Sequence, residues 1–441
     1  MKRRPNILFI ISDDHRHGTL GVTGDPVVET PVLDHLAVEG TLVAQTHIMG
    51  GLTDAVCAPS RAALLTGTNP ITALGEDGQP KEGDATYQTS PGLPLLPEIF
   101  RKVGYHTFFT GKWHNDTNSF ARSFDDGDRI FMGGMSDHYH VPLHPFDPGG
   151  VYPEQAIYQG EGFSTALFAD AAVEYLATYD PDDAPFLLYL SFMAPHDPRT
   201  PPPPWDEMYE SQNITLPPNF LPEHPFDNGE MRGRDELLAK FPRDANEVRG
   251  HIADYYGMIS NMDSHIGRVL DALDRFGHQS DTIVVYVADH GLAVGQHGLM
   301  GKQNVYDHSL RIPLILAGPG IPADHMIDSL HFNFDLFPTL CELADIAIPD
   351  NVDGQSMVPS FANDRGRHSL YAFYKDVQRM VKDDRWKYIA YSVPNDIARS
   401  QLFDLVADPW EMNDLSEDVK HAERVTSMVR LLAEWRMRIG H

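Results

Sequence analysis

Short apolar runs alternate along the chain with longer stretches in which apolar residues recur at helical spacing. Several of the runs lack in–out alternation, which is typical of strands buried on both faces of a parallel sheet. The predicted strands are 6–11, 42–45, 106–110, 186–192, 282–287 and 313–316. The predicted helices are 31–39, 59–65, 95–103, 164–179, 246–275 and 336–344. This alternation predicts an α/β fold with a large, mostly parallel central sheet sandwiched by helices.

The pattern changes at two places. Residues 195–241 include four consecutive prolines and little periodicity, which fits either a loop over a binding site or a plain surface insertion. From residue 349 the chain predicts antiparallel strands and a final helix. These elements are 370–374, 386–391, 401–403 and 419–437. We therefore expect a main domain of residues 1–348 and a small antiparallel α+β subdomain of residues 349–441.

Charged and metal-binding residue types directly follow four of the predicted strands. They are Asp13 and Asp14, then Lys112 and His114, then His196, and finally Asp289 and His290. One Asp after a strand is usually a helix cap or turn former. In open α/β sheets, however, the functional site lies at the carboxyl ends of the strands. Four such strand ends together predict one shared site.

Asp13, Asp14, Asp289 and His290 form a candidate site for a divalent cation. Adjacent carboxylates repel each other unless a cation lies between them. Three carboxylates favour a hard ion, either Ca²⁺ or Mg²⁺. The alternative is that these residues occupy separate surface turns.

The composition narrows the range of partners. The 441 residues include 34 Lys and Arg against 63 Asp and Glu, a formal net charge of −29. This charge argues against nucleic acids and anionic membranes as partners. Two cysteines cannot build a disulfide framework. The chain begins Met-Lys-Arg-Arg, but the apolar run from Ile7 to Ile11 is too short for a signal peptide. We expect a soluble, cytoplasmic protein without a membrane span.

The segment from Cys57 to Arg61 reads Cys-Ala-Pro-Ser-Arg. Pro59 suits the first turn of a helix, so Cys57 is expected at a helix N-terminus, where backbone N–H groups favour an anion. Arg61 adds a positive fork that matches a tetrahedral oxyanion. By themselves these residues fit either a thiolate nucleophile of low pKa or a buried cysteine before a capped helix.

Cys57-x-Pro59-Ser60-Arg61, followed by Ala-Ala-Leu-Leu-Thr-Gly, resembles the hallmark of type I sulfatases in the alkaline phosphatase superfamily. The resemblance extends along nearly the whole chain. Its other segments are Pro5 to Leu8 with Asp13-Asp14, Gly111 to His114, Pro195-His196, Asp289 to Gly291, Gly301-Lys302, Asp384 to Tyr388, and Leu402 to Leu405 with Asp408-Pro409.

The resemblance implies a mechanism. Cys57 becomes formylglycine through a maturation enzyme, and Asp13, Asp14, Asp289 and His290 hold Ca²⁺ together with the modified Cys57. A hydroxyl of the hydrated aldehyde attacks sulfur. Arg61, Lys112 and Lys302 stabilise the sulfuryl oxygens, His196 protonates the leaving oxygen with help from Lys302, and His114 deprotonates the second hydroxyl. Many members of the family have Asn where this chain has His290, which leaves Mg²⁺ as an alternative.

The resemblance favours a sulfate ester hydrolase acting on a small sulfated substrate, such as a sulfated mono- or oligosaccharide. The alternatives are a phosphodiesterase or phosphonate monoester hydrolase of the same superfamily, and a non-catalytic anion-binding relative. Residues that could contact sulfate or line the substrate pocket are His297, Trp113, Asp54, Tyr374 and Lys375. An acidic exterior disfavours long polyanionic chains as substrates. The sequence does not specify the oligomeric state.

Overall fold

A computed structural model describes residues 4–75, 87–180 and 184–440, and an eight-stranded sheet forms its centre. The strand order is β13-β2-β12-β10-β1-β9-β5-β6. The strands are β1 (Asn6–Ser12), β2 (Gly40–Val43), β5 (His106–Lys112), β6 (Asp126–Phe131), β9 (Phe186–Ser191), β10 (Thr282–Ala288), β12 (Leu314–Ala317) and β13 (His325–Ile327). The central strands β10, β1, β9, β5 and β6 are parallel, whereas β12 runs antiparallel to both of its neighbours.

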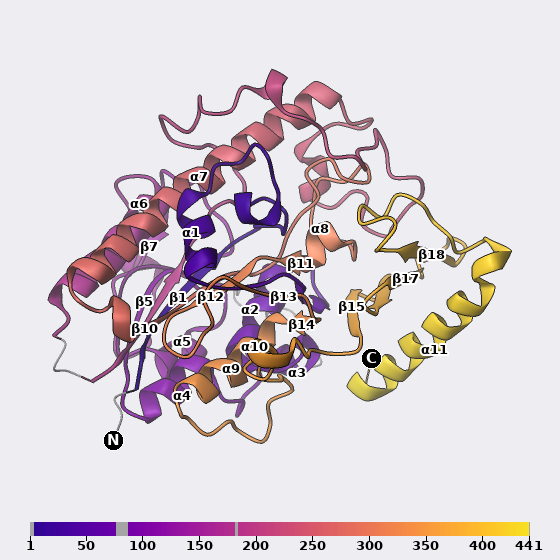
Figure 1. Ribbon diagram of the computed structural model, residues 1–441. Coiled ribbons are helices and arrows are strands. Elements are labelled where there is room, and N and C mark those ends of the chain that lie inside the picture. Colours follow the sequence, from indigo (N-terminus) through magenta and orange to yellow (C-terminus); the bar gives the residue numbers. More distant parts are fainter. Residues whose placement is uncertain (1–3, 76–86, 181–183, 441) are drawn as a thin grey trace.

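Helices cover both faces of this sheet (Figure 1). One face of β1, with Leu8 and Ile10, packs against α1 (Pro31–Glu39), α6 (Ser164–Thr178) and α7 (Ala245–Arg275). The opposite face, with Ile7 and Phe9, packs in one apolar cluster with a second set of helices. These are α2 (Cys57–Thr66), α4 (Leu96–Lys102), α5 (Thr117–Ser123) and α9 (Leu336–Leu343). The fully buried strands explain why their sequences are continuously apolar.

A second sheet has the order β18-β17-β16-β15-β4. Its antiparallel strands are β15 (Leu370–Tyr374), β16 (Gln378–Lys382), β17 (Trp386–Tyr391) and β18 (Arg399–Asp404), and α11 (Ala422–Ile439) packs on it (Figure 1). The short strand β4 (Gly50–Gly51) joins it from the N-terminal half by pairing in parallel with β15. Gly50 has φ of +81°, and a Cβ there would lie 1.9 Å from the carbonyl oxygen of Phe373, so only glycine permits this approach.

The remaining elements are short. They are β3 (Thr46–His47), β7 (Pro142–Leu143), β8 (Tyr158–Gln159), β11 (Arg311–Ile312), β14 (His331–Phe332), α3 (Pro70–Leu74), α8 (Asp307–Leu310), α10 (Ser360–Asn363), and 3₁₀ turns at Gly21–Thr23, Glu154–Ala156, Ser211–Asn213, Asp235–Leu238, Gln279–Asp281, Asn333–Asp335 and Val419–His421. Apart from two of these turns, residues 195–241 are irregular.

The predicted α/β fold and the C-terminal antiparallel sheet are confirmed. Each predicted helix of the main domain is present, with ends shifted by at most two residues. Strand β2 lies at 40–43, earlier than predicted, and the final helix begins at Ala422 after a 3₁₀ turn. Four strands of the two large sheets were missed, namely β4, β6, β13 and β16, and so were the two-residue strands β3, β7, β8, β11 and β14. The boundary at residue 349 stays a prediction, and the basic residues Lys2 and Arg3 lie outside the described ranges. Among the described helices, none has the length and apolarity needed to cross a membrane.

Buried ion pairs tie the second sheet to the main body. Lys387 Nζ on β17 lies 2.8 Å from Asp307 Oδ1 and 2.6 Å from Glu411 Oε1, and Lys382 Nζ on β16 lies 3.0 Å from Asp307 Oδ2. Both lysines are buried. Buried charges of this kind depend on their partners, because removal of one leaves another uncompensated in a medium of low dielectric constant.

We predict that Lys387→Met lowers the free energy of unfolding by about 3 kcal/mol, because it leaves the buried carboxylate of Glu411 without its cationic partner. The exposed Arg430→Met is the control and should change stability by less than about 0.5 kcal/mol. Urea denaturation followed by circular dichroism measures both. Equal effects of the two substitutions would contradict the structural role of this ion cluster.

Candidate active site

The parallel pairing of β1 with β10 brings the first acidic residues together. Ser12 and Ala288, the last residues of the two strands, are register partners. The next residues are therefore neighbours: Asp289 N donates to Ser12 O at 3.0 Å, and Asp14 N donates to Asp289 Oδ1 at 3.2 Å. The sheet register alone thus places these carboxyl groups side by side.

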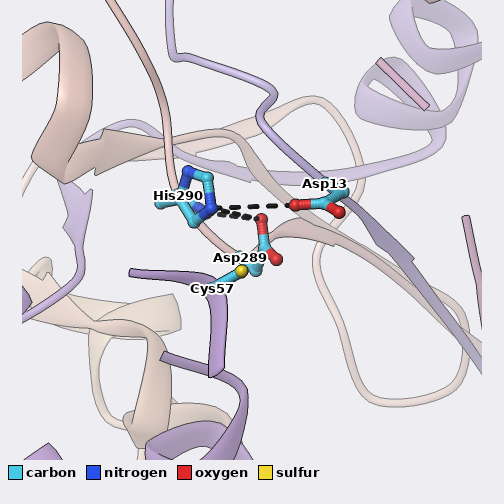
Figure 2. A group of neighbouring side chains, drawn as sticks. All are labelled: Asp13, Cys57, Asp289 and His290. Carbon is cyan, nitrogen blue, oxygen red and sulfur yellow. Dashed lines mark hydrogen bonds and ion pairs between the residues drawn. The ribbon is translucent and has the colours of Figure 1, made fainter. Parts of the chain in front are cut away.

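Asp13, Cys57, Asp289 and His290 each contribute one potential ligand atom to a buried group whose atoms all lie within 4.8 Å of one another (Figure 2). His290 Nε2 lies 3.7 Å from Asp13 Oδ1 and 3.6 Å from Asp289 Oδ1. Asp14 borders this group, because its Oδ1 lies 3.2 Å from the same imidazole nitrogen. The structure therefore brings all five predicted metal ligands together.

Two observations test whether a divalent cation fits this group. Asp13 Oδ1 and His290 Nε2 are buried and make no hydrogen bond within the described part of the chain. Burial and the charge of Asp13 raise the pKa of Asp289 to about 6. Burial would lower the pKa of His290, but Asp289 and Asp14 raise it to about 9. Unpaired ligand atoms and crowded carboxylates are what a bound cation would relieve, so the donor set fits one.

Three cationic side chains pair one-to-one with the three carboxylates. Arg61 Nε on α2 donates to Asp289 Oδ2 at 2.8 Å, Lys112 at the end of β5 pairs with Asp13 Oδ2, and Lys302 Nζ donates to Asp14 Oδ1 at 2.8 Å. All three cations are buried. Their charges balance those of the carboxylates, so a divalent cation would make the site net positive and suited to an anion.

Cys57 is the first residue of α2, and its Sγ lies 3.2 Å from Nδ1 of His114. Burial would raise the pKa of the Cys57 thiol, but Lys112, His114 and Lys302 outweigh that effect and hold the pKa well below its usual range. His114 has φ of +59°, and Gly134 makes room for its ring, since a Cβ on Gly134 would lie 2.5 Å from His114 Nε2. The backbone is therefore shaped to hold this imidazole against residue 57.

His196 forms the other side of the site. Its Nε2 lies 3.1 Å from Lys302 Nζ, and its Nδ1 lies 2.7 Å from the carbonyl oxygen of Asp197. The carboxylate of Asp197 pairs in turn with Arg234, whose Nη1 also lies 2.7 Å from Asp235 Oδ1. Thus the prediction of residues 195–241 as a loop over a site is consistent with these contacts.

The sequence did not point to Asp197, Arg234 and Asp235, which help to position His196 and Lys302. Nor did it point to Gln303, whose Nε2 donates to Asp235 Oδ2 at 2.8 Å and to the Asp54 carbonyl at 3.1 Å. The charged residues of 195–241 follow no periodic pattern. Their only signal was the position of Asp197 next to His196.

The weaker candidates separate into two groups. Tyr374 OH donates to Glu230 Oε2 at 2.9 Å, and Lys375 Nζ lies 2.9 Å from the same oxygen and also pairs with the exposed Asp54. By contrast, Trp113 packs in the aromatic core with Phe109, Phe120 and Phe124. His297 stacks on Tyr306 at a centroid distance of 4.0 Å, and burial lowers its pKa to about 3. These rings serve packing.

Comparison with known proteins gives matches along almost the whole chain. Residues 5–346 match the family model described as Sulfatase, and residues 295–438 match the model of the C-terminal part of N-sulphoglucosamine sulphohydrolase. An ulvan-active sulfatase of Formosa agariphila is 30% identical over 436 residues, covering 93% of this chain and 77% of the relative. An N-acetylglucosamine-6-O-sulfatase of Bacteroides thetaiotaomicron is 25% identical, covering 98% and 86%.

Solved structures share the fold. One of them, determined in complex with its substrate D-glucosamine-2-N,6-O-disulfate, has a TM-score of 0.79 at 23% identity and covers 99% of this chain and 98% of its own. A phosphonate monoester hydrolase of Agrobacterium radiobacter has a TM-score of 0.77 at 21% identity, with coverage of 99% and 96%. At these identities the likeness concerns the fold alone.

We predict that His290→Ala weakens binding of Ca²⁺ about tenfold or more, because it removes one ligand atom and leaves the Arg61 and Lys112 ion pairs intact. His35→Ala, at a solvent-exposed histidine, is the control. Calorimetric titration of Ca²⁺ and Mg²⁺ into chelator-treated protein measures the affinities. If His290→Ala and His35→Ala bind the ions equally well, the cation lies elsewhere.

Proposed function

The chain belongs to the sulfatase family and is a sulfuric ester hydrolase, and on that premise we propose that it releases inorganic sulfate from a small sulfated mono- or oligosaccharide through a formylglycine made from Cys57. One observation carries this proposal. Cys57 begins α2 inside the cluster of buried carboxylates and faces His114 at 3.2 Å. This arrangement supports a nucleophile, a base and a cation site around one residue.

Asp13, Asp14, Asp289 and His290 are the residues that would hold Ca²⁺ or Mg²⁺, together with an oxygen of the modified residue 57. The bound ion would supply Lewis-acid polarisation of a sulfuryl oxygen, and the hydrated aldehyde would supply a hydroxyl as nucleophile. An oxygen donor at residue 57 suits a hard ion better than the thiol of unmodified Cys57 does.

The other residues handle protons and charge. His114 Nδ1, which contacts residue 57, is placed to accept a proton from a hydroxyl there. Burial lowers the pKa of His114, which keeps the imidazole neutral and able to act as a base. Arg61, Lys112 and Lys302 would offset the negative charge on the sulfuryl oxygens. Arg61 holds the site in shape, since it donates to Asp289, to the Lys112 carbonyl and to Ser191 Oγ.

His196 is the proposed proton donor to the leaving oxygen. The carbonyl oxygen of Asp197 fixes its Nδ1, which leaves Nε2 directed to Lys302. Delivery of this proton would prevent a free alkoxide from forming on the departing alcohol.

The predicted pocket residues Asp54 and Lys375, together with Glu230, favour a sugar of low charge. Asp54, Glu230 and Lys375 come from three distant segments and offer two acceptors and one donor set, which suits sugar hydroxyls. The two carboxylates, together with a net charge of −29, disfavour long polyanions. The printed names of the relatives, one ulvan-active and one acting on N-acetylglucosamine-6-O-sulfate groups, support a saccharide.

A phosphodiesterase or phosphonate monoester hydrolase is the second candidate, because the phosphonate monoester hydrolase of Agrobacterium radiobacter shares this fold. Phosphate diesters carry a single negative charge, as sulfate monoesters do, so charge alone does not separate the two classes.

We predict that residue 57, isolated in a peptide after expression with a formylglycine-generating enzyme, has the mass of the aldehyde and not of the thiol. Cys57→Ala should lose hydrolysis of an aryl sulfate by at least about 1000-fold, because the nucleophile is absent. Cys341→Ala, at a buried cysteine in α9, is the matched control for the loss of a thiol. Retained activity in Cys57→Ala would exclude residue 57 as nucleophile.

We predict that kcat/KM for an aryl sulfate exceeds that for a phosphate diester of the same alcohol. We also predict that singly sulfated glucosamine is hydrolysed faster than a heavily sulfated polymer. Release of inorganic sulfate and of the alcohol measures these rates. A faster phosphate diester would establish the second candidate, and a faster polymer would overturn the inference from surface charge.

A further inference from the structure

A cavity of about 440 Å³ lies apart from the metal-binding cluster. Its walls come from the loop after β1, the segment around residues 215–219, the region near α8 and the loop after β18. Among the lining residues are Arg16, Asp25, His308, Arg311 and Trp410, and none of the proposed metal ligands or catalytic residues lines it. This cavity therefore belongs to a different site.

Two guanidinium groups in its wall have no acidic partner. Within the described residues, neither Arg16 nor Arg311 has a carboxylate oxygen within 4 Å. Arg16 Nη1 donates to the Ala293 carbonyl at 2.8 Å, and Arg311 Nε donates to the Ala44 carbonyl at 2.7 Å. Guanidinium groups have five N–H donors, so both retain donors for a further acceptor.

The carboxylates of the same wall already have hydrogen-bond or ion-pair partners. Asp25 accepts from the backbone N–H groups of Val27 and Val28 and from Tyr256 OH at 2.6 Å. Asp307 pairs with two buried lysines, and Glu411 pairs with one of them and accepts from Asp307 N at 2.8 Å. Among the described residues, the two guanidinium charges without an ion pair therefore outnumber the one carboxylate without an ion pair, that of Asp25, and the wall keeps a net positive charge.

Two histidines of the wall add no charge of their own. Burial lowers the pKa of His17 and His308, so both imidazoles are neutral. His17 Nδ1 and His308 Nε2 are buried away from solvent, which leaves the guanidinium groups of Arg16 and Arg311 as the cationic donors that a ligand in the cavity can reach.

We propose that this cavity binds a tetrahedral sulfuryl oxyanion through Arg16 and Arg311. The ligand is either free sulfate or the sulfate group of a small ester, both of which present the same oxygens. Guanidinium forks match such oxyanions geometrically. Trp410, which is 39% exposed, and Tyr256 leave an apolar wall on which the carbon part of an ester can lie.

Calorimetric titration of sodium sulfate into the Lys302→Ala protein, with chloride exchanged at constant ionic strength, tests this site apart from the active site. We expect one sulfate to remain bound. Thr215→Glu, at an exposed residue lining the cavity, should weaken it about tenfold because its carboxylate competes for the guanidinium groups, whereas Thr215→Gln should not. Arg311→Gln should weaken it similarly, with folding checked by circular dichroism.

Equal affinities of Thr215→Glu and Thr215→Gln, or loss of all sulfate binding in Lys302→Ala, would overturn the proposal. A titration with glucosamine 6-sulfate distinguishes the two possible ligands, free sulfate and a sulfate ester. Tighter binding of inorganic sulfate would identify free sulfate as the ligand, and tighter binding of the sugar would identify the ester. In the otherwise unaltered protein, Thr215→Glu should hydrolyse the aryl sulfate at the unaltered rate, so failure of this proposal and failure of the proposed function are distinguishable.

Discussion

Three buried carboxylates at the carboxyl edge of one sheet are the constraint on which the rest of the site depends. The parallel register of β1 and β10 places Asp13, Asp14 and Asp289 next to one another. The repulsion among these carboxylates is offset by three cations from other segments. Arg61, Lys112 and Lys302 each form an ion pair with one of the carboxylates. The helix α2, the end of β5 and the loop after β10 are therefore placed by charge as well as by apolar packing.

This balance explains how so acidic a protein can act on an anion. The net charge of −29 belongs to the chain as a whole, whereas the six paired charges of the site cancel. A bound divalent cation would then set the sign of the local potential. We propose that the acidic exterior acts at longer range and discriminates among substrates by their total charge.

Much of this arrangement was predictable because it follows local rules. Buried strands have continuously apolar sequences, and Asp13 and Asp289 follow such strands directly, so their convergence could be expected from the fold class. The proposed conversion of Cys57 to formylglycine rests on family resemblance, since the residues themselves fit a thiolate equally well. The pairing of Gly50 with Phe373 and the contact of Arg234 with Asp197 depend on tertiary approach of segments without periodicity, and no local signal predicts them.

The most direct test of the account is a crystal structure of the Cys57→Ser variant, grown with Ca²⁺ and an aryl sulfate. The account predicts the cation among Asp13, Asp14, Asp289 and His290, and the sulfate group in contact with residue 57, Lys112 and Lys302, with its ester oxygen toward His196. A sulfate group bound away from residue 57, or a cation bound outside these four ligands, would contradict it.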